Sequence, residues 1–518
     1  MVLDGARTIG GTKIFLREGR AGFLLDFGLN YQRWGQYFEE FLRPRAARGL
    51  FDLWQLGLVP HVSGLYRNDL VPPGFRLPSG APPLEVCAVF LSHAHLDHCG
   101  LLGVVRSDLP VVASRVTLAV LKALQDTGQA EFYGELAYCR RRSPNVAGEL
   151  EADPSGVCRG RPGHAADGVP SRELHRLWTT VPRQRRALES QPLQTAPAEY
   201  EGVRVRAYPV DHSIPGALAF AFECTDGLVV YTGDLRRHGR AGALVDRMVA
   251  DLQREKVQAL LVEGTRVGRE PSSQVTEAEV LERSRKVVAG HPGELVVADF
   301  GPRHVERLQT FLQVARDTDR QLVALPKDGY LLEALAAADP SFRELVGHPS
   351  LRFFLRPRLS QDTWLREFTN RHRQRMVAAA DVQRDPGRYL LAFSFFDLVD
   401  LLDVEPENGA YVYSSSEAYG EDSRVDFWRL WNWLQRLRMR PYGFRWEGSD
   451  ARGRPEFGGG FHASGHIHPQ DLLELIRAVR PRYVVPVHTE DPGWFVENLR
   501  GEPVRVRVLH DGEELQLP

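Results

Sequence analysis

Residues 93–98 read HAHLDH, so four side chains that could bind a divalent metal fall within six positions. His93, His95, Asp97 and His98 offer imidazole nitrogens and a carboxylate, which are ligands that suit Zn²⁺. They follow the apolar run AVFL, where a strand is expected to end and a helix to begin. Taken alone, the hexapeptide is equally compatible with a metal site and with a solvated polar loop.

Four more ionisable residues each follow an apolar run typical of a β-strand. They are His212 after VRVRAYPV, Asp234 in VVYTGD, Glu263 in ALLVEG and His488 in VVPVH. Strand ends that meet at one edge of a sheet are where a rigid scaffold places a site. Because five segments share this pattern, we predict a metal site in preference to isolated polar groups of the core.

The elements that must position these side chains fall into two patterns. Alternating or continuous apolar runs predict strands in GTKIFLRE, GFLLDFG, VCAVFL, ALAFAFEC and QALLVEG. From about residue 268 to 458, helical and strand patterns alternate, as in α/β domains. A chain of 518 residues is expected to form two domains, or one domain with a large insertion.

Several segments carry weaker signals. A helical period runs through residues 36–58, and the composition of residues 143–169 predicts a long flexible excursion. His164 and His468 stand alone and are interpreted as surface residues. Trp428, Trp431 and Trp433 fit the core side of a helix better than a base-stacking surface.

Charge and cysteine usage limit the partners and the compartment. The formal net charge is −2, so no global basic excess indicates a polyanion partner, although a local basic groove would suffice. The five cysteines are scattered without a CxxC pair, which fits a reducing compartment. With no signal-like N-terminus and no apolar run of membrane length, we expect a cytoplasmic protein without a membrane partner.

The motifs together resemble a known family. Asp26 in LLDFG, the HAHLDH cluster, His212 in DHSIPGA and Asp234 in YTGD resemble the first four motifs of the metallo-β-lactamase fold. Glu263 in EGT, His466 in HASGH and His488 in VPVHTE resemble the three further motifs of the β-CASP nucleases. Within that group the chain looks most like the RNA-cleaving members, ribonuclease J and the pre-mRNA 3′-end cleavage endonuclease. The DNA-repair members typically lack a histidine at the place of His488.

The resemblance implies an α/β fold, an αββα metallo-β-lactamase sandwich with an inserted β-CASP α/β domain. The implied ranges are 1–267 for the first part of the metallo-β-lactamase domain, 268–458 for the β-CASP domain and 459–518 for the closing part.

The resemblance also implies roles for individual residues. One zinc ion would be bound by His93, His95 and His212, and a second by Asp97, His98 and His488, with Asp234 bridging both. Mn²⁺ is the alternative ion. The candidate catalytic residues are His466 as general acid, Glu263 as the group that orients it, and Asp97. Asp26 would anchor the ligand loop, and His462 and Ser464 resemble residues that hold a 5′-phosphate.

The implied function is a zinc-dependent phosphodiesterase that cleaves RNA, as an endonuclease, a 5′-to-3′ exonuclease or both. The expected partner is RNA, in single-stranded form, and a homo-oligomer is left open. A DNA nuclease of the same fold is the first alternative. A small-ester or thioester hydrolase is disfavoured because it does not need Glu263 and His466, and an inactive scaffold because every ligand is kept.

Overall fold

The computed structural model describes residues 1–39, 41–76, 80–128, 131–182, 187–268, 275–301, 303–357, 362–416 and 421–517. The chain forms two compact units. Unit 1 comprises Met1–Arg237, Ala241–Pro271 and His466–Pro518, and unit 2 comprises His238–Arg240 and Ser272–Gly465. The second unit is therefore inserted between pieces of the first. The assignment of residues 1–267, 268–458 and 459–518 to named domains stays a prediction.

Unit 1 contains two seven-stranded sheets. The first has the order β1 (Val2–Asp4), β2 (Lys13–Glu18), β3 (Ala21–Leu25), β4 (Ala88–Phe90), β5 (Val111–Ala113), β10 (Gly163–Ala165) and β12 (Leu193–Thr195). The second has the order β13 (Glu199–Tyr200), β14 (Val203–Pro209), β15 (Leu218–Cys224), β16 (Gly227–Tyr231), β17 (Val257–Glu263), β27 (Tyr483–Val487) and β28 (Arg505–Val506).

The two sheets pack face to face because their strands alternate in side-chain size. In β15, Phe220 and Phe222 belong to the core between the sheets, whereas Ala219 and Ala221 belong to the core on the opposite face. The ring of Phe90 lies 5.2 Å from that of Phe220, and Phe23 lies 5.1 Å from Phe222, measured between ring centroids. Aromatic residues of both sheets thus fill the middle of a sandwich.

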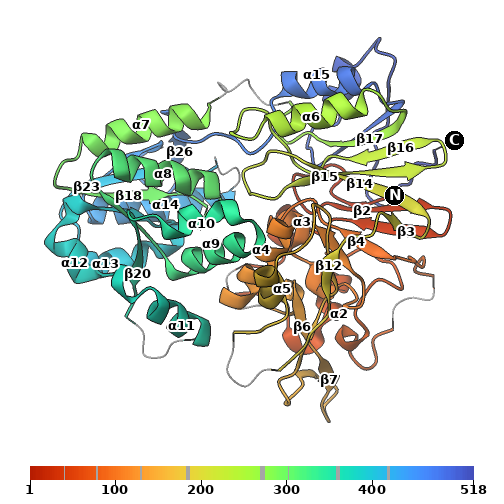
Figure 1. The fold of residues 1–518 in the computed structure, drawn as a ribbon, viewed down its shortest axis with the longest axis horizontal. Helices are drawn as coiled ribbons and strands as arrows, with labels where there is room; N and C mark the ends of the chain where they lie inside the picture. Colours follow the sequence, from red (N-terminus) through yellow and green to blue (C-terminus); the bar gives the residue numbers. More distant parts are fainter. Residues whose placement is uncertain are drawn as a thin grey trace. The chain divides into compact units, whose positions relative to one another are not determined.

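Helices cover the outer faces of this sandwich (Figure 1). The second sheet packs against α6 (Ala243–Leu252), α15 (Pro469–Val479) and α16 (Gly493–Asn498), which bury their apolar residues in one shared core. On the first sheet, α4 (Arg115–Thr127) contacts β10 and α5 (Arg172–Trp178). The expected αββα arrangement is confirmed.

Unit 2 is built on one parallel sheet. Its order is β21 (Met376–Ala378), β20 (Leu351–Leu355), β19 (Gln321–Ala324), β22 (Tyr389–Ala392), β18 (Leu295–Asp299), β23 (Gly409–Tyr413) and β24 (Met439–Tyr442). Every neighbouring pair is parallel, and this explains the continuous apolar runs of these strands. A hairpin of β25 (Phe444–Glu447) and β26 (Arg454–Phe457) follows.

Helices flank both faces of this parallel sheet. One core joins it to α12 (Ala379–Arg384), α13 (Leu401–Val404) and α14 (Glu421–Arg436). The other helices that contact its strands are α7 (Glu277–Ala289), α8 (Val305–Asp317) and α9 (Pro326–Ala338). Trp428, Trp431 and Trp433 pack against the first of these cores, as their spacing predicts. The expected α/β insertion is therefore confirmed.

Two local expectations were wrong. Within the described part of residues 36–58, the helical period yields only a 3₁₀ turn, Ala46–Arg48, and the short helix α2 (Leu50–Gln55). The segment 143–169 is not a featureless excursion, because it contains β8 (Leu150–Ala152), β9 (Cys158–Gly160) and β10. These strands are short and polar in part, so composition alone did not reveal them. The strands β9 and β10 pair with strands outside the segment, whereas β8 pairs with Arg142–Pro144.

None of the helices in the described part of the chain combines the length and apolar character that a membrane crossing requires.

Candidate metal centre

The HAHLDH cluster occupies the turn between β4 and a one-turn helix, α3 (Leu96–Cys99). His93 and His95 lie in the turn, and Asp97 and His98 lie in the helix. The turn and α3 are held against the segment that follows β3, because the amides of Phe27 and Leu29 donate to the carbonyls of His98 and Leu96. The two turn residues and the two helix residues can therefore approach a bound ion from different sides, although they are close in sequence.

Four further candidates of unit 1 reach the cluster from the ends of strands in the second sheet. His212 and Asp234 follow β14 and β16, Glu263 is the last residue of β17, and His488 comes directly after β27. The strands β16, β17 and β27 are parallel neighbours, so their carboxyl ends share one edge. The strand β14 runs in the same direction, since both β14 and β16 are antiparallel to β15.

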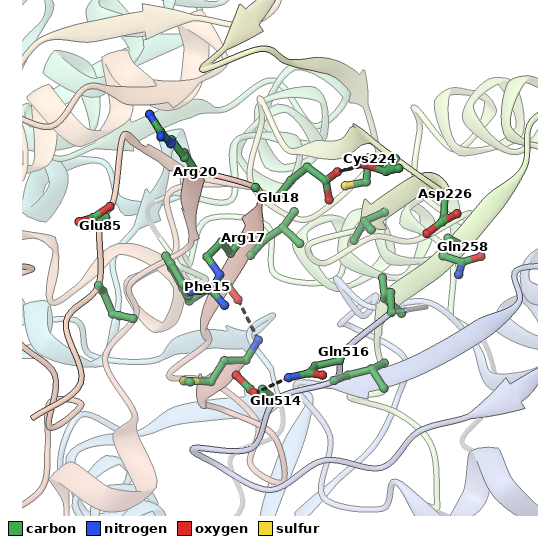
Figure 2. A pocket seen from close by; sticks show the side chains of 18 of the residues that line it. Phe15, Arg17, Glu18, Arg20, Glu85, Cys224, Asp226, Gln258, Glu514 and Gln516 are labelled. Atoms are coloured by element: carbon green, nitrogen blue, oxygen red, sulfur yellow. Dashed lines mark hydrogen bonds between the residues drawn. The ribbon is translucent and has the colours of Figure 1, made fainter.

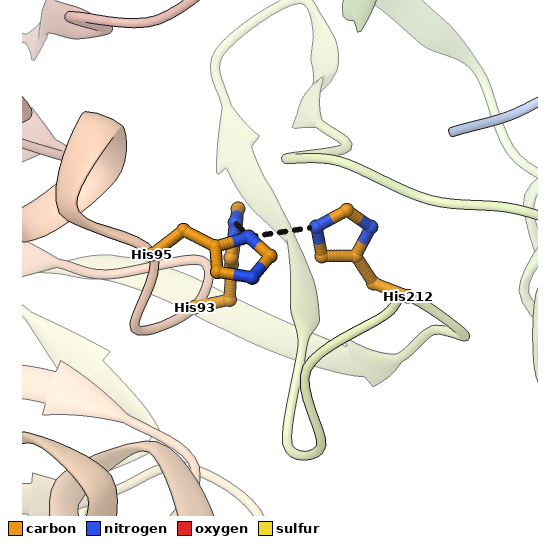
Figure 3. Close-up of side chains that lie close together, drawn as sticks. All are labelled: His93, His95 and His212. Carbon is orange, nitrogen blue, oxygen red and sulfur yellow. Dashed lines mark hydrogen bonds between the residues drawn. The ribbon is translucent and has the colours of Figure 1, made fainter. Parts of the chain in front are cut away.

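Three histidine rings converge on one point (Figure 3). The Nδ1 atom of His95 lies 3.1 Å from His93 Nε2 and 3.0 Å from His212 Nε2. Ligand nitrogens of a tetrahedral zinc ion lie about 3.3 Å apart, given Zn–N bonds of about 2.0–2.1 Å. The spacing therefore suits one such ion.

A second group of donors lies beside the first. The Oδ2 atom of Asp97 is 3.3 Å from His488 Nε2 and 3.9 Å from His98 Nε2. The ligand atoms of these three residues all lie within 4.8 Å of one another, close enough to bind one shared ion. The structure thus contains two sets of three donors without a common member.

Asp234 connects the two sets. Its Oδ2 atom lies 3.1 Å from His98 Nε2 and 3.9 Å from His488 Nε2 in one set, and 3.7 Å from His93 Nε2 and 3.8 Å from His212 Nε2 in the other. One carboxylate oxygen therefore faces histidines of both groups, as a bridging ligand would.

Unsatisfied polar atoms provide an independent test of whether the site fits a metal. Both carboxylate oxygens of Asp234 and Nε2 of His98 are buried, and none of them makes a well-formed hydrogen bond to any described residue. Leaving a buried carboxylate without hydrogen bonds is costly in a folded protein. A divalent cation bound by these atoms would remove that cost, so the donor set fits a metal ion.

The electrostatic environment of His93 and Asp234 favours the protonation states in which these two side chains bind metals. Burial, together with the neighbouring His98 and His212, holds the pKa of His93 well below its usual value. Burial opposes ionisation of Asp234, but the charges of His488 and His98 outweigh it and hold the pKa of Asp234 well below its usual value. Neutral imidazole and ionised carboxylate are the ligand forms of these side chains.

Hydrogen bonds behind the cluster fix the ligands. Asp26 accepts from the amide and the hydroxyl of Ser92, each at 2.7 Å, and from the hydroxyl of Tyr231 at 2.5 Å. It also lies 2.7 Å from Nδ1 of His98. Thr265 Oγ1 lies 3.0 Å from His488 Nδ1. Such contacts orient the imidazole rings, and those of Asp26 agree with the anchoring role expected for it.

A histidine–glutamate pair lies next to the donors. His466 Nδ1 is 3.0 Å from Glu263 Oε2, and Glu263 is itself fixed by the amides of Leu235 at 3.0 Å and Thr265 at 3.3 Å. Burial alone would lower the pKa of His466, but the Glu263 carboxylate reverses this and raises it to about 9. The raised pKa favours the protonated ring at neutral pH, and a side-chain exposure of 23% leaves the ring accessible to a ligand.

The predicted site residues are divided between the two units. His93, His95, Asp97, His98, His212, Asp234, Glu263, His466 and His488 all belong to unit 1, whereas His462 and Ser464 belong to unit 2. The Ser464 carbonyl accepts from His238 Nε2 at 2.8 Å within unit 2. The role of His462 and Ser464 in binding a phosphate stays a prediction.

Sequence reasoning missed some residues and misjudged one. Ser92 and Tyr231 were not singled out, although each borders a motif that was recognised. His164 is not a surface residue, because its ring is buried between the hydroxyl of Tyr200 at 2.8 Å and the amide of Gln194 at 2.9 Å. It sits on β10, a strand that was not predicted, so its burial could not be inferred.

Comparison with protein families covers both parts of this site. Residues 72–271, which contain HAHLDH, His212, Asp234 and Glu263, match the metallo-beta-lactamase superfamily. Residues 461–507, which contain His466 and His488, match the family described as the Zn-dependent metallo-hydrolase RNA specificity domain.

Curated relatives and a solved structure extend the comparison. Ribonuclease J of Mycolicibacterium smegmatis is 24% identical over 412 residues, which cover 78% of this chain and 58% of that protein. Ribonuclease J of Pyrococcus abyssi is 23% identical over 296 residues, which cover 56% of this chain and 60% of that protein. The matches thus span about three fifths of these relatives.

A crystal structure of a protein of unknown function from Enterococcus faecalis V583 shares the fold. It is 20% identical, its TM-score is 0.66, and the match covers 99% of this chain and 98% of the other. The strand-end donors and the sandwich agree with these matches: residues 72–271 match the metallo-β-lactamase superfamily, and residues 461–507 match the RNA specificity domain of the zinc-dependent metallo-hydrolases.

Proposed function

We propose that this protein is a two-zinc phosphodiesterase that cleaves RNA. The observation that carries the proposal is the pair of donor sets joined by Asp234, with the His466–Glu263 pair beside them. The RNA specificity domain and the ribonuclease J relatives support RNA as the substrate. In this proposal His93, His95 and His212 hold one ion, Asp97, His98 and His488 hold the other, and Asp234 bridges them.

Two bound ions would act as Lewis acids on the phosphodiester and would make water a usable nucleophile at neutral pH. The protein supplies the positions. Asp26 and Thr265 hold the rings of His98 and His488, which fixes the two donor sets relative to each other. Because both sets lie on strand ends of one sandwich, the scaffold keeps them in place during turnover.

His466 is proposed to donate the proton that the leaving 3′-oxygen requires. Its Nδ1 is engaged with Glu263, and its Nε2 is the nitrogen proposed to face the substrate. The raised pKa, about 9, keeps the ring protonated at neutral pH. Glu263 touches no substrate in this scheme, and its role is to position His466 and to stabilise its charge.

The decisive experiment incubates the pure, metal-loaded protein with 5′-labelled RNA and with DNA of the same sequence, each bearing a 5′-phosphate or a 5′-hydroxyl. We expect cleavage of RNA that a chelator abolishes. Mononucleotide products would assign a 5′-to-3′ exonuclease, and internal fragments would assign an endonuclease. Cleavage of DNA in preference to RNA, or hydrolysis of a simple thioester alone, would overturn the proposal.

A further inference from the structure

A cavity of about 850 Å³ lies in unit 1 at the amino ends of β16 and β17. Four segments surround the hollow seen in Figure 2: the β2–β3 turn, residues 82–85, the β15–β16 turn and residues 514–517. The same strand β17 carries Gln258 at the cavity and Glu263 at the metal centre. Five residues of strand correspond to about 16 Å, so the cavity is a separate site.

Gln258 is the unusual residue of this cavity. It is only 2% exposed, yet neither its Nε2 nor its Oε1 finds a hydrogen-bond partner within the described chain. A β-bulge places it there, because Leu228 pairs with Val257 and Val229 pairs with Ala259, which leaves Gln258 without a cross-strand partner. Bulges of this kind re-aim a side chain and are frequent near functional sites. A buried amide without protein partners leaves hydrogen-bonding capacity for a molecule bound in the cavity.

The other lining residues restrict the class of ligand. The walls combine apolar side chains, among them Phe15, Leu84 and Val229, with charges of both signs. The acidic residues Glu18, Glu85, Asp226 and Glu514 outnumber the basic residues Arg17 and Arg20. An excess of carboxylates repels a phosphodiester, and charged walls are unsuited to a purely apolar molecule.

A peptide meets all of these conditions. The amide of Gln258 offers one acceptor oxygen and donor N–H groups, which pair with the N–H and C=O of a peptide group. We propose that this cavity binds an extended peptide segment of a partner protein, whose main-chain amide pairs with Gln258.

The proposal does not depend on nuclease activity and is tested by binding. The probe is N-acetyl-leucine N-methylamide, a minimal peptide with two amide groups, titrated into the metal-loaded protein and followed by ligand-observed NMR. We expect binding in the millimolar range, weakened about tenfold or more in Gln258→Leu, which loses both hydrogen bonds. Gln258→Glu, which keeps the shape but loses the donor, should also bind more weakly.

The matched control is Gln253→Leu, which removes an exposed amide that does not line the cavity. It should bind the probe as the wild type does, and all variants should keep the wild-type RNA cleavage rate. Equal affinity of the wild type and Gln258→Leu, or no binding up to the solubility limit of the probe, would overturn the proposal. Displacement of the probe by uridine 5′-monophosphate would also overturn it, since the cavity would then accept a nucleotide.

Discussion

Asp234 is the residue that faces both donor sets. Its Oδ2 atom lies within 3.9 Å of ring nitrogens from either set. We expect two zinc ions per chain by elemental analysis after mild purification, with activity lost on chelation. His95→Ala should lower the content toward one ion, because His95 serves one set, whereas Asp234→Ala should deplete both. Full activity after thorough chelation would contradict the metal centre.

His466 and His488 are expected to differ in function although both lie at the site. His466 is paired with Glu263, and His488 is 3.3 Å from Asp97 within a donor set. His466→Ala should therefore lower kcat by about 10²–10⁴-fold with zinc retained, whereas His488→Ala should deplete zinc. Parallel kcat and zinc measurements test this.

The matched control for these variants is His468→Ala, since this ring accepts from the Gln470 amide at the start of α15 and belongs to neither donor set. It should keep both zinc and turnover. Equal zinc loss in His466→Ala and His488→Ala would refute the division of roles.

At the scale of elements, strands could be predicted wherever burial imposes a pattern. The runs that became β15, β17 and β27 are apolar because these strands are inner strands of a sandwich, and their ends correctly located His488 and Glu263. The short strands β8, β9 and β10 were not predicted, because three residues are too few to show a pattern of alternating apolar and polar side chains. The helix expected over residues 36–58 shrank to α2, which buries Leu50, Leu53 and Trp54. Tertiary packing thus determined the secondary structure wherever the local sequence pattern was weak.

The carboxyl end of β18 in unit 2 allows a prediction about stability and pH. Asp299 is 4% exposed; burial raises its pKa to about 7, although the Tyr411 hydroxyl donates to it at 2.6 Å. The unfolded chain would titrate near 3.8, so the folded state binds the proton more tightly. The stabilisation due to Asp299 is full below about pH 4 and is lost as the pH rises toward 7.

Asp299→Asn should remove this dependence. At pH 8 the variant should be more stable than the wild type by up to about 4 kcal/mol, from about three pKa units at 1.36 kcal/mol each. Near pH 4 the two proteins should be equally stable. Urea unfolding at both pH values measures the difference. A wild type that is the more stable protein at pH 8 would show that the charged Asp299 is favourable.

At the scale of the whole molecule, the sequence predicted the fold class and the interruption of one α/β unit by another. It could do so because the motifs occur in order along the chain, from Asp26 to His488, on both sides of the inserted segment. The sequence could not predict the hydrogen bonds that hold the candidate metal ligands in place. The hydrogen bonds of Ser92 and Tyr231 to Asp26 join residues that are distant in sequence and carry no periodic signal.

Whether the proposed RNA cleavage is exonucleolytic or endonucleolytic depends on residues of both units. His462 and Ser464 of unit 2 are proposed to bind a terminal 5′-monophosphate. A phosphate near charge −2 accepts charge-assisted hydrogen bonds worth about 1.5–3 kcal/mol each. One such bond predicts a preference of roughly tenfold to a hundredfold for 5′-monophosphorylated RNA over 5′-hydroxyl RNA, measured as the ratio of kcat/KM values.

Ser464→Ala should reduce this preference while cleavage at internal positions of a structured RNA continues, because no metal ligand is altered. Ser341→Ala, which changes an exposed serine elsewhere in unit 2, should leave the preference intact. The product pattern gives a second measurement. If 5′-labelled RNA yields internal fragments of many lengths regardless of its end group, exonuclease action from a 5′-phosphate is excluded. The protein would then be an endonuclease, with its cleavage positions chosen by RNA structure instead of by the chain end.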